Sequence, residues 1–192
     1  MSKSKLNTFA RVRALSGWRA VAFSAALLER MVPNYQLFCE LTEYEHGNIC
    51  QKCLSLIWET LKSPKTKVNF AVQLEKVEDV IPDPSDYDNF GVFPAVDAGM
   101  ALAATINLIL DVDPQGAVVV SKLSQGSVEA YLLASGEADD DSVKQHPLMQ
   151  FEVALQNELL DVVEGAGKAT DIVERARILA LEEKMTNIGL EI

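Results

Sequence analysis

The sequence predicts an all-α protein: one domain over residues 1–192, with about seven helices and a long C-terminal helix. Three observations predict this class. Apolar residues recur at three- and four-residue spacing, prolines and glycines divide the chain into helix-sized pieces, and only one short stretch has the β-branched composition of a strand. A chain of 192 residues, 48% of them hydrophobic, is long enough to bury its own core.

The first half of the chain predicts a basic segment over 7–15 and helices over about 18–32, 34–46, 48–63 and 66–80. Pro33 separates the first two helices, because its ring cannot continue the hydrogen-bond ladder. Asn34 can cap the second helix, which Gly47 ends. In that helix we expect an inward face of Tyr35, Phe38 and Leu41.

The second half predicts helices over about 94–110, 113–135 and 147–179. The run Val118–Val120 favours a strand. No second strand is available to pair with it, and an isolated strand would leave backbone groups unsatisfied, so residues 117–123 are expected to be helical. Gly165 and Gly167 each lower helix propensity by up to ~1 kcal/mol, which predicts a kink or break in the C-terminal helix.

Charge and hydropathy exclude several classes of function. A net charge of −11 argues against a general nucleic-acid binder. The charge is uneven: residues 1–35 hold six basic groups and one acidic group. This predicts a basic first helix docked on an acidic body; the alternative is a basic arm for an acidic partner or membrane surface. The stretch 95–110 is shorter than the ~20 residues of a membrane span, and no signal-peptide pattern is found, so a cytoplasmic location is expected.

Three cysteines form the first candidate site. Cys50 and Cys53 have the Cys-x-x-Cys spacing at a helix start, which can lower a thiol pKa. With Cys39 and His46 they could complete a zinc set of four ligands. The more ordinary interpretation is that free cysteines are small buried hydrophobic residues.

Carboxylates form two further candidates. Glu75 and Glu78 share a helix face, and with Asp161 or Asp97 they could hold magnesium in a hydrolase. The loop 86–97 matches a twelve-residue calcium loop only in part. Solvated helix faces and self-capping turns explain the same patterns.

Asp97 lies among apolar neighbours, and a buried carboxylate needs a partner. Lys122 or Arg30 could provide it. We therefore consider a candidate pocket built from Asp97, Ser121, Lys122 and Arg30.

Short runs along most of the chain resemble the bacterial YjaG family. They are Glu29–Arg30–Met31 with Pro33–Asn34–Tyr35, Ile57–Trp58–Glu59–Thr60, Asn69–Phe70 with Gln73–Leu74–Glu75–Lys76, Gly91–Val92 with Pro94–Ala95 and Asp97–Ala98, Val120–Ser121–Lys122, and Asn187–Ile188–Gly189. The resemblance implies a helical, cytoplasmic protein of unknown function. It supplies no reaction and no catalytic residue, and the cysteines are not part of it.

We therefore expect a non-enzymatic module that binds another protein or a second copy of itself, without a predicted cofactor. A magnesium-dependent hydrolase built on the helix carboxylates is the first alternative. A metal or thiol sensor built on the cysteines is the second.

Overall fold

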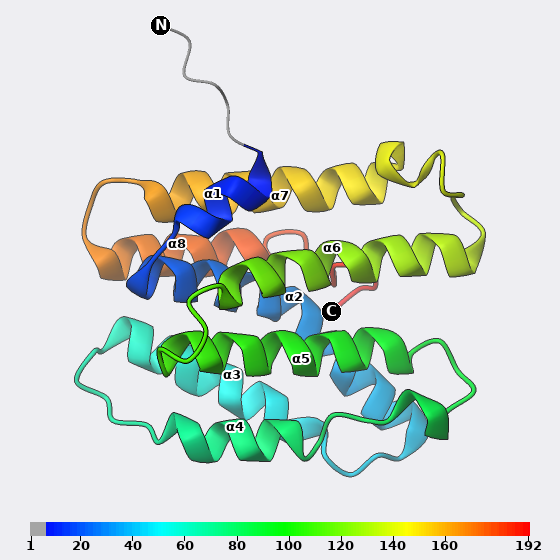
Figure 1. Cartoon of the computed structure of the whole chain (residues 1–192), viewed down its shortest axis with the longest axis horizontal. Helices are drawn as coiled ribbons and strands as arrows, with labels where there is room; N and C mark the ends of the chain where they lie inside the picture. Colours follow the sequence, from blue (N-terminus) through cyan, green and yellow to red (C-terminus); the bar gives the residue numbers. More distant parts are fainter. Residues whose placement is uncertain (1–6) are drawn as a thin grey trace, which may run out of the picture.

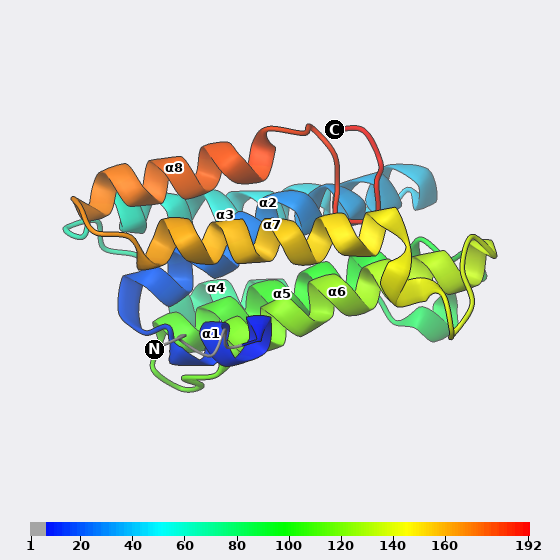
Figure 2. The ribbon, with the colours of Figure 1, turned by 90° about the horizontal axis from the view of Figure 1, so that it is seen from above.

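The helices of the computed structural model run back and forth along one long axis (Figures 1 and 2). The structure describes residues 7–192. They form α1 (Thr8–Ala14), α2 (Gly17–Thr42), α3 (Gly47–Lys62), α4 (Phe70–Glu78), α5 (Val92–Ile109), α6 (Gly116–Ser135), α7 (Pro147–Glu164) and α8 (Ala169–Leu181), with 3-10 turns at Pro84–Asp86 and Val143–Gln145. Within this range the only β pairing is an isolated bridge between Met185 and Glu191. The all-α prediction is confirmed.

Helix α2 is the centre of the bundle. It packs against α3, α5, α6, α7 and α8. Nearly every residue from Ala22 to Tyr35 is buried, so this helix has no solvated face over that length. Its burial on all sides lets one core form around it.

Helix α5 is the second core element. It packs against α2, α4 and α6. By length and composition it is the one described helix that could cross a membrane, but half of it is buried inside the bundle. Its apolar character is therefore explained by the core, and α5 is not a membrane span.

Pro33 does not end a helix, so the predicted boundary there is wrong. Helix α2 continues through Pro33 to Thr42. A proline inside a helix costs about 3 kcal/mol or more. Here the neighbours Val32 and Tyr35 are fully buried, and this burial offsets the cost. The expected inward face is also wrong at Leu41, which is 76% exposed.

The remaining boundaries follow local signals. Helix α4 begins only at Phe70, because the Asn69 side chain caps it by accepting from the Val72 N–H at 3.2 Å. Residues 117–123 are helical, as expected. Helix α6 starts close to α5 because Gly116 has no side chain: a Cβ there would lie 2.5 Å from the Ala104 carbonyl oxygen. The expected break near Gly165 separates α7 from α8.

The alternating direction of the helices brings three connections to the same end of the molecule, at the right of Figure 1. They are the α2–α3, α4–α5 and α6–α7 connections. The C-terminal segment, residues 185–192, leaves α8 and lies against the bundle toward this end (Figure 2). Four segments far apart in the sequence thus share one surface.

Candidate functional site

An apolar cavity of about 390 Å³ opens at this end of the molecule. We call it the apolar cavity. Its walls come from the end of α2, the start of α5, α6 and the C-terminal segment, and its lining includes Asn34, Leu37, Phe38, Leu41, Phe90, Pro94, Tyr131, Ile188 and Leu190. Pockets of about 300–1,000 Å³ with mostly apolar walls are typical of ligand sites.

Helical spacing supplies the first wall. Asn34, Leu37 and Leu41 follow one another at three- and four-residue intervals on α2, so they share a face. Phe90 supplies the opposite wall just before α5. Its ring lies 6.2 Å from the Tyr131 ring, and this contact joins the segment before α5 to α6.

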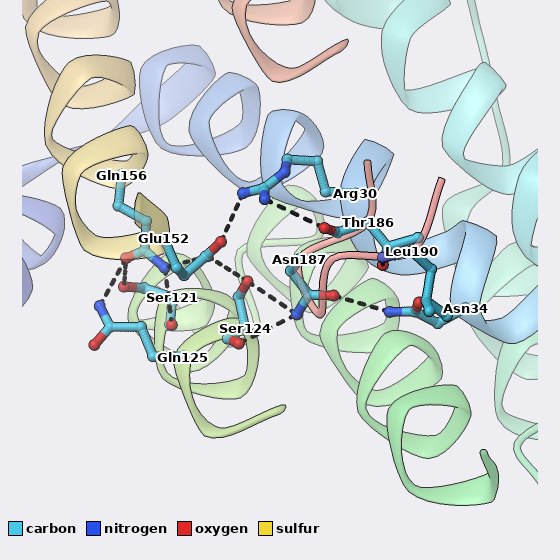
Figure 3. Close-up of polar contacts among 10 residues, drawn as sticks. All are labelled: Arg30, Asn34, Ser121, Ser124, Gln125, Glu152, Gln156, Thr186, Asn187 and Leu190. Carbon is cyan, nitrogen blue, oxygen red and sulfur yellow. Dashed lines mark hydrogen bonds and ion pairs between the residues drawn. The ribbon is translucent and has the colours of Figure 1, made fainter. Parts of the chain in front are cut away.

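The C-terminal segment forms the last wall, and Asn187 holds it in place (Figure 3). The Asn187 backbone N–H donates to the Arg30 carbonyl at 3.0 Å. Its side-chain Nδ2 donates to the Ser124 carbonyl at 3.2 Å, and its Oδ1 accepts from Asn34 Nδ2 at 2.8 Å. These bonds fix the position of the following residue, Ile188, in the cavity wall.

A buried ion pair lies beside the C-terminal segment. Arg30 Nη1 donates to Glu152 Oε2 at 2.6 Å, and the two side chains are 2% and 0% exposed. The other oxygen of Glu152 accepts from Ser124 Oγ at 2.5 Å and from Gln156 Nε2 at 3.0 Å (Figure 3). A buried charge needs such partners, and here one oxygen has one partner and the other has two. This set is the Arg30–Glu152 network.

Asn34 is the point where the network reaches the cavity. The residue is 5% exposed and lines the cavity. Because Asn187 Nδ2 already donates to Ser124, its Oδ1 faces Asn34, which must therefore present its Nδ2. The Oδ1 of Asn34 is buried and has no hydrogen-bond partner. An unsatisfied buried acceptor of this kind calls for an explanation.

A second hollow of about 660 Å³ adjoins the apolar cavity and shares Phe90 with it. We call it the Asp97 hollow; its other lining residues include Phe93, Lys122 and Leu123. Ser127 Oγ donates to Asp97 Oδ2 at 2.8 Å. Burial raises the pKa of Asp97, and the Ser127 hydrogen bond opposes that rise.

Acidic residues dominate the segments around both hollows. Residues 34–48, 79–97, 127–146 and 185–192 contain 14 Asp and Glu residues and one basic residue, Lys144; Lys122 adds a second cation in the lining of the Asp97 hollow. We call this surface the acidic end. A surface of one sign attracts ligands of the other sign and raises their association rate.

Comparisons with known proteins agree on one family. The family model described as "Protein of unknown function (DUF416)" matches residues 7–191. The chain belongs to this family.

Relatives cover nearly the whole chain. The Escherichia coli K12 protein described as "Uncharacterized protein YjaG" is 37% identical over 184 residues, which is 94% of each chain. An uncharacterised Haemophilus influenzae protein is 37% identical over 190 residues, 94% of this chain and 95% of that one. The crystal structure of a DUF416 family protein from Shewanella baltica has a TM-score of 0.89 and 35% identity, covering 98% of this chain and 100% of that chain. The resemblance to the YjaG family is confirmed.

In this DUF416 protein the four residues of the candidate pocket do not converge. Asp97 and Lys122 both line the Asp97 hollow, but the Lys122 ammonium lies over the Phe9 ring at 5.7 Å. Arg30 pairs with Glu152 instead of Asp97. Ser121 donates to Gln156 Oε1 at 2.6 Å inside the network. The partner of Asp97 is Ser127, which the sequence did not indicate.

The candidate metal residues lie far apart. Glu75 and Glu78 are exposed on α4, whereas Asp161 is exposed on α7, and the two helices are on opposite sides of the bundle (Figure 1). Arg11 holds Asp161 in an ion pair of 2.7 Å. The part of the chain described here brings together no three His, Cys, Asp or Glu side chains that could hold a metal ion. The calcium-loop match fails as well, since α5 begins at Val92, within that loop.

The cysteines lie in the core between α2 and α3. Cys39, Cys50 and Cys53 are free and buried. Burial raises the pKa of Cys50 and of Cys53 to about 12, and it also raises the pKa of Cys39. His46 is exposed and its ring packs edge-on against Tyr44. The thiols therefore fill space as neutral groups.

Sequence reasoning missed the residues that carry the site. Glu152 and Gln156 were not singled out in the sequence, although their four-residue spacing puts both on one face of α7. Asn34 was assigned to a helix cap. The run Asn187–Ile188–Gly189 appeared in the family resemblance, and that was the one available signal that a C-terminal segment outside any helix has a defined position.

Proposed function

We propose that this protein is a non-enzymatic, cytoplasmic protein-binding module, and that its ligand is a basic amphipathic helix of another protein. The apolar face of that helix would fill the apolar cavity, and its Lys or Arg side chains would face the acidic end. Helix-in-groove binding of this kind relies on a few apolar anchors at helical spacing.

The observation that carries the proposal is the position of an apolar cavity inside a predominantly acidic surface. Leu41 and Leu37 line the cavity and are 76% and 38% exposed, so together they offer an apolar surface to a partner. Asp97 in the adjoining hollow keeps Oδ1 free of the Ser127 bond, so it can accept from a cation. Apolar contact and charge complementarity therefore coincide.

The same charges bear on self-association. An isologous dimer through this surface would place 14 acidic residues of one copy against 14 of the other. Like charges at close range repel, so a second copy is a poorer occupant of this surface than a basic partner. A homodimer through another surface remains the alternative.

The test is the binding of a fluorescein-labelled helical peptide of leucine and lysine, followed by fluorescence anisotropy. We expect binding that weakens as salt increases, because screening reduces the attraction of exposed charges. The same peptide with glutamate in place of lysine should not bind.

A matched pair of variants locates the binding surface. Leu41→Lys places a charge beside the cavity and should weaken peptide binding more than about tenfold. Ile178→Lys introduces the same residue at a site on α8 that is 59% exposed, and it should bind like the unchanged protein. Equal affinities for the two variants would overturn the proposal, since the peptide would then bind without using the cavity.

A further inference from the structure

The Asp97 hollow extends along the outer face of α6, and the residues of α6 that line it are arranged to match a second copy of the same helix. We propose that two copies of this protein form a homodimer in which α6 of one copy packs antiparallel against α6 of the other, across this hollow. The inference does not depend on the proposed function, because the hollow and the apolar cavity share only Phe90 among their lining residues.

Four residues of α6 line the hollow: Val119, Leu123, Gly126 and Ala130. Intervals of four, three and four residues place them on one face, with the spacing that paired helices bury against each other. The first two side chains are large, and the last two are small or absent. In an antiparallel pair, Leu123 of each copy lies opposite Gly126 of the other. Val119 then lies opposite Ala130, so large side chains meet small ones.

A single copy does not explain why position 126 is glycine. Gly126 lies inside α6, where glycine is a poorer helix former than alanine. A Cβ at this position would meet no atom within 4 Å, so the packing of residues 7–192 does not require the missing side chain. In the dimer, Leu123 of the second copy occupies this space, and the glycine allows the two helices to approach closely.

Two charges beside these four residues complement each other only in a dimer. Lys122 and Glu129 are exposed on the same edge of α6, and neither forms an ion pair within residues 7–192. They are about 10 Å apart along the helix, which is too far for direct contact in one copy. In the antiparallel pair, Lys122 of each copy lies beside Glu129 of the other, so the contact forms twice.

Exposed apolar side chains of α5 enlarge the surface that a second copy would cover. Phe93 and Met100 are 49% and 47% exposed. Asp97 bonds to Ser127, and α5 and α6 run in opposite directions (Figure 1), so Met100 lies beside the middle of α6. There each Met100 is close to the Met100 of the other copy. Burial of these side chains favours association.

The antiparallel direction also keeps the acidic ends apart. Helix α6 begins away from the acidic end and finishes within it (Figure 1). Reversing the second helix therefore places the two acidic ends at opposite ends of the dimer. The repulsion that disfavours self-association through the acidic end does not arise here.

Sedimentation velocity at increasing protein concentration measures the dimer. We expect its dissociation constant to rise at least about tenfold in Lys122→Glu and in Glu129→Lys, because each variant places like charges together twice. An equimolar mixture of the two variants should dimerise again, since each contact then joins Glu to Lys. The control is Lys52→Glu, at an exposed position of α3 on the other side of the bundle (Figure 2), and it should dimerise like the unchanged protein.

Gly126→Leu separates pairing from folding. Leucine is a better helix former than glycine, and its Cβ meets no atom in one copy, so the thermal midpoint of the monomer should rise by about 2 °C. In the dimer the new side chain collides with Leu123 of the second copy, so dimerisation should be lost. A lost dimer together with a raised midpoint excludes misfolding as the cause.

The outcomes distinguish this inference from the proposed function. A monomer at every concentration would overturn the dimer and leave the proposed function intact. A dimer that neither the charge reversals nor Gly126→Leu weakens would also overturn the inference, because it would form through another surface. A dimer that responds as expected in a protein that binds no lysine peptide would support the inference and overturn the proposed function.

Discussion

The Arg30–Glu152 network and the apolar cavity share Asn34 and the C-terminal segment, yet they differ in how completely their polar groups are paired. In the network, both oxygens of Glu152 have partners, and Ser121 and Gln156 bond to each other. In the cavity, Asn34 Oδ1 has none. The comparison teaches that the Arg30–Glu152 network is fully hydrogen-bonded at its carboxylate, whereas the structure beside the cavity tolerates one buried amide oxygen without a hydrogen bond.

The physical basis is the cost of burying polar groups. A charge taken out of water without partners is strongly unfavourable, so the ion pair is tolerable because both carboxylate oxygens of Glu152 are hydrogen-bonded. A single neutral acceptor costs much less. The fold can therefore tolerate one unsatisfied amide oxygen, at Asn34, but it could not tolerate an unsatisfied carboxylate at the same depth.

The largest effect is expected from removing one partner of the buried Arg30–Glu152 ion pair. Arg30→Met leaves Glu152 buried without its cation, and we expect a loss of about 3–5 kcal/mol in the free energy of unfolding. Urea denaturation measures it. Arg177→Met is the control: Arg177 pairs with Glu29 at 3.0 Å but is 31% exposed, so its loss should be smaller. Equal losses would contradict the distinction between buried and partly exposed pairs.

The second prediction concerns the thiols, which are buried in the core between α2 and α3. Burial raises the pKa of Cys50 and Cys53 to about 12, so almost none of either thiol is thiolate at neutral pH. Ellman's reagent should react with them only after unfolding. Cys53→Ala should cost about 1–3 kcal/mol through the cavity it leaves. Rapid reaction of the folded protein would instead support a thiol sensor.

A smaller effect on the free energy of unfolding is expected at Asp97, which lines the Asp97 hollow. Burial raises its pKa, so the folded protein binds this proton more tightly than the unfolded chain does. The stability it contributes is fully present below the unfolded pKa and is lost as the pH rises through the folded pKa. Asp97→Asn has no such loss and can still accept from Ser127.

Measuring the free energy of unfolding of the unchanged protein and of Asp97→Asn across the pH range tests this expected pH dependence. The variant should be the more stable one at neutral pH, and its advantage should vanish in acid. The same variant should bind the lysine peptide less tightly, as expected where function retains a destabilising group. A variant that is less stable at neutral pH would show that Asp97 has a structural role.

Helical periodicity was enough to predict the fold class, most helices and the break near Gly165. It failed at Pro33, because the local cost of a proline inside a helix was offset by burial of Tyr35 from distant parts of the chain. It also failed at Leu41, which the spacing placed inward. Both errors come from contacts that local sequence does not contain.

The site was harder to predict than the fold. Asp97 was recognised as a half-buried carboxylate, but its partner Ser127 is 30 residues away and lies on another helix. Glu152 and Arg30 are separated by 122 residues. Carboxylates on one helix can be paired from their spacing, whereas partners across the bundle follow from the crossing of helices, which spacing does not specify.

The smallest expected effect concerns an exposed pair and completes the comparison with Arg30–Glu152. Arg11 binds Asp161 at 2.7 Å and Glu164 at 2.9 Å, and the Asp161 side chain is 73% exposed. Asp161→Asn should change the free energy of unfolding by about 0.5 kcal/mol or less, because water solvates the carboxylate and Glu164 still holds Arg11. Added salt should remove even this difference. A change as large as that of Arg30→Met would mean that α1 depends on this one contact for docking against α7, so that exposure alone does not decide what an ion pair contributes to this fold.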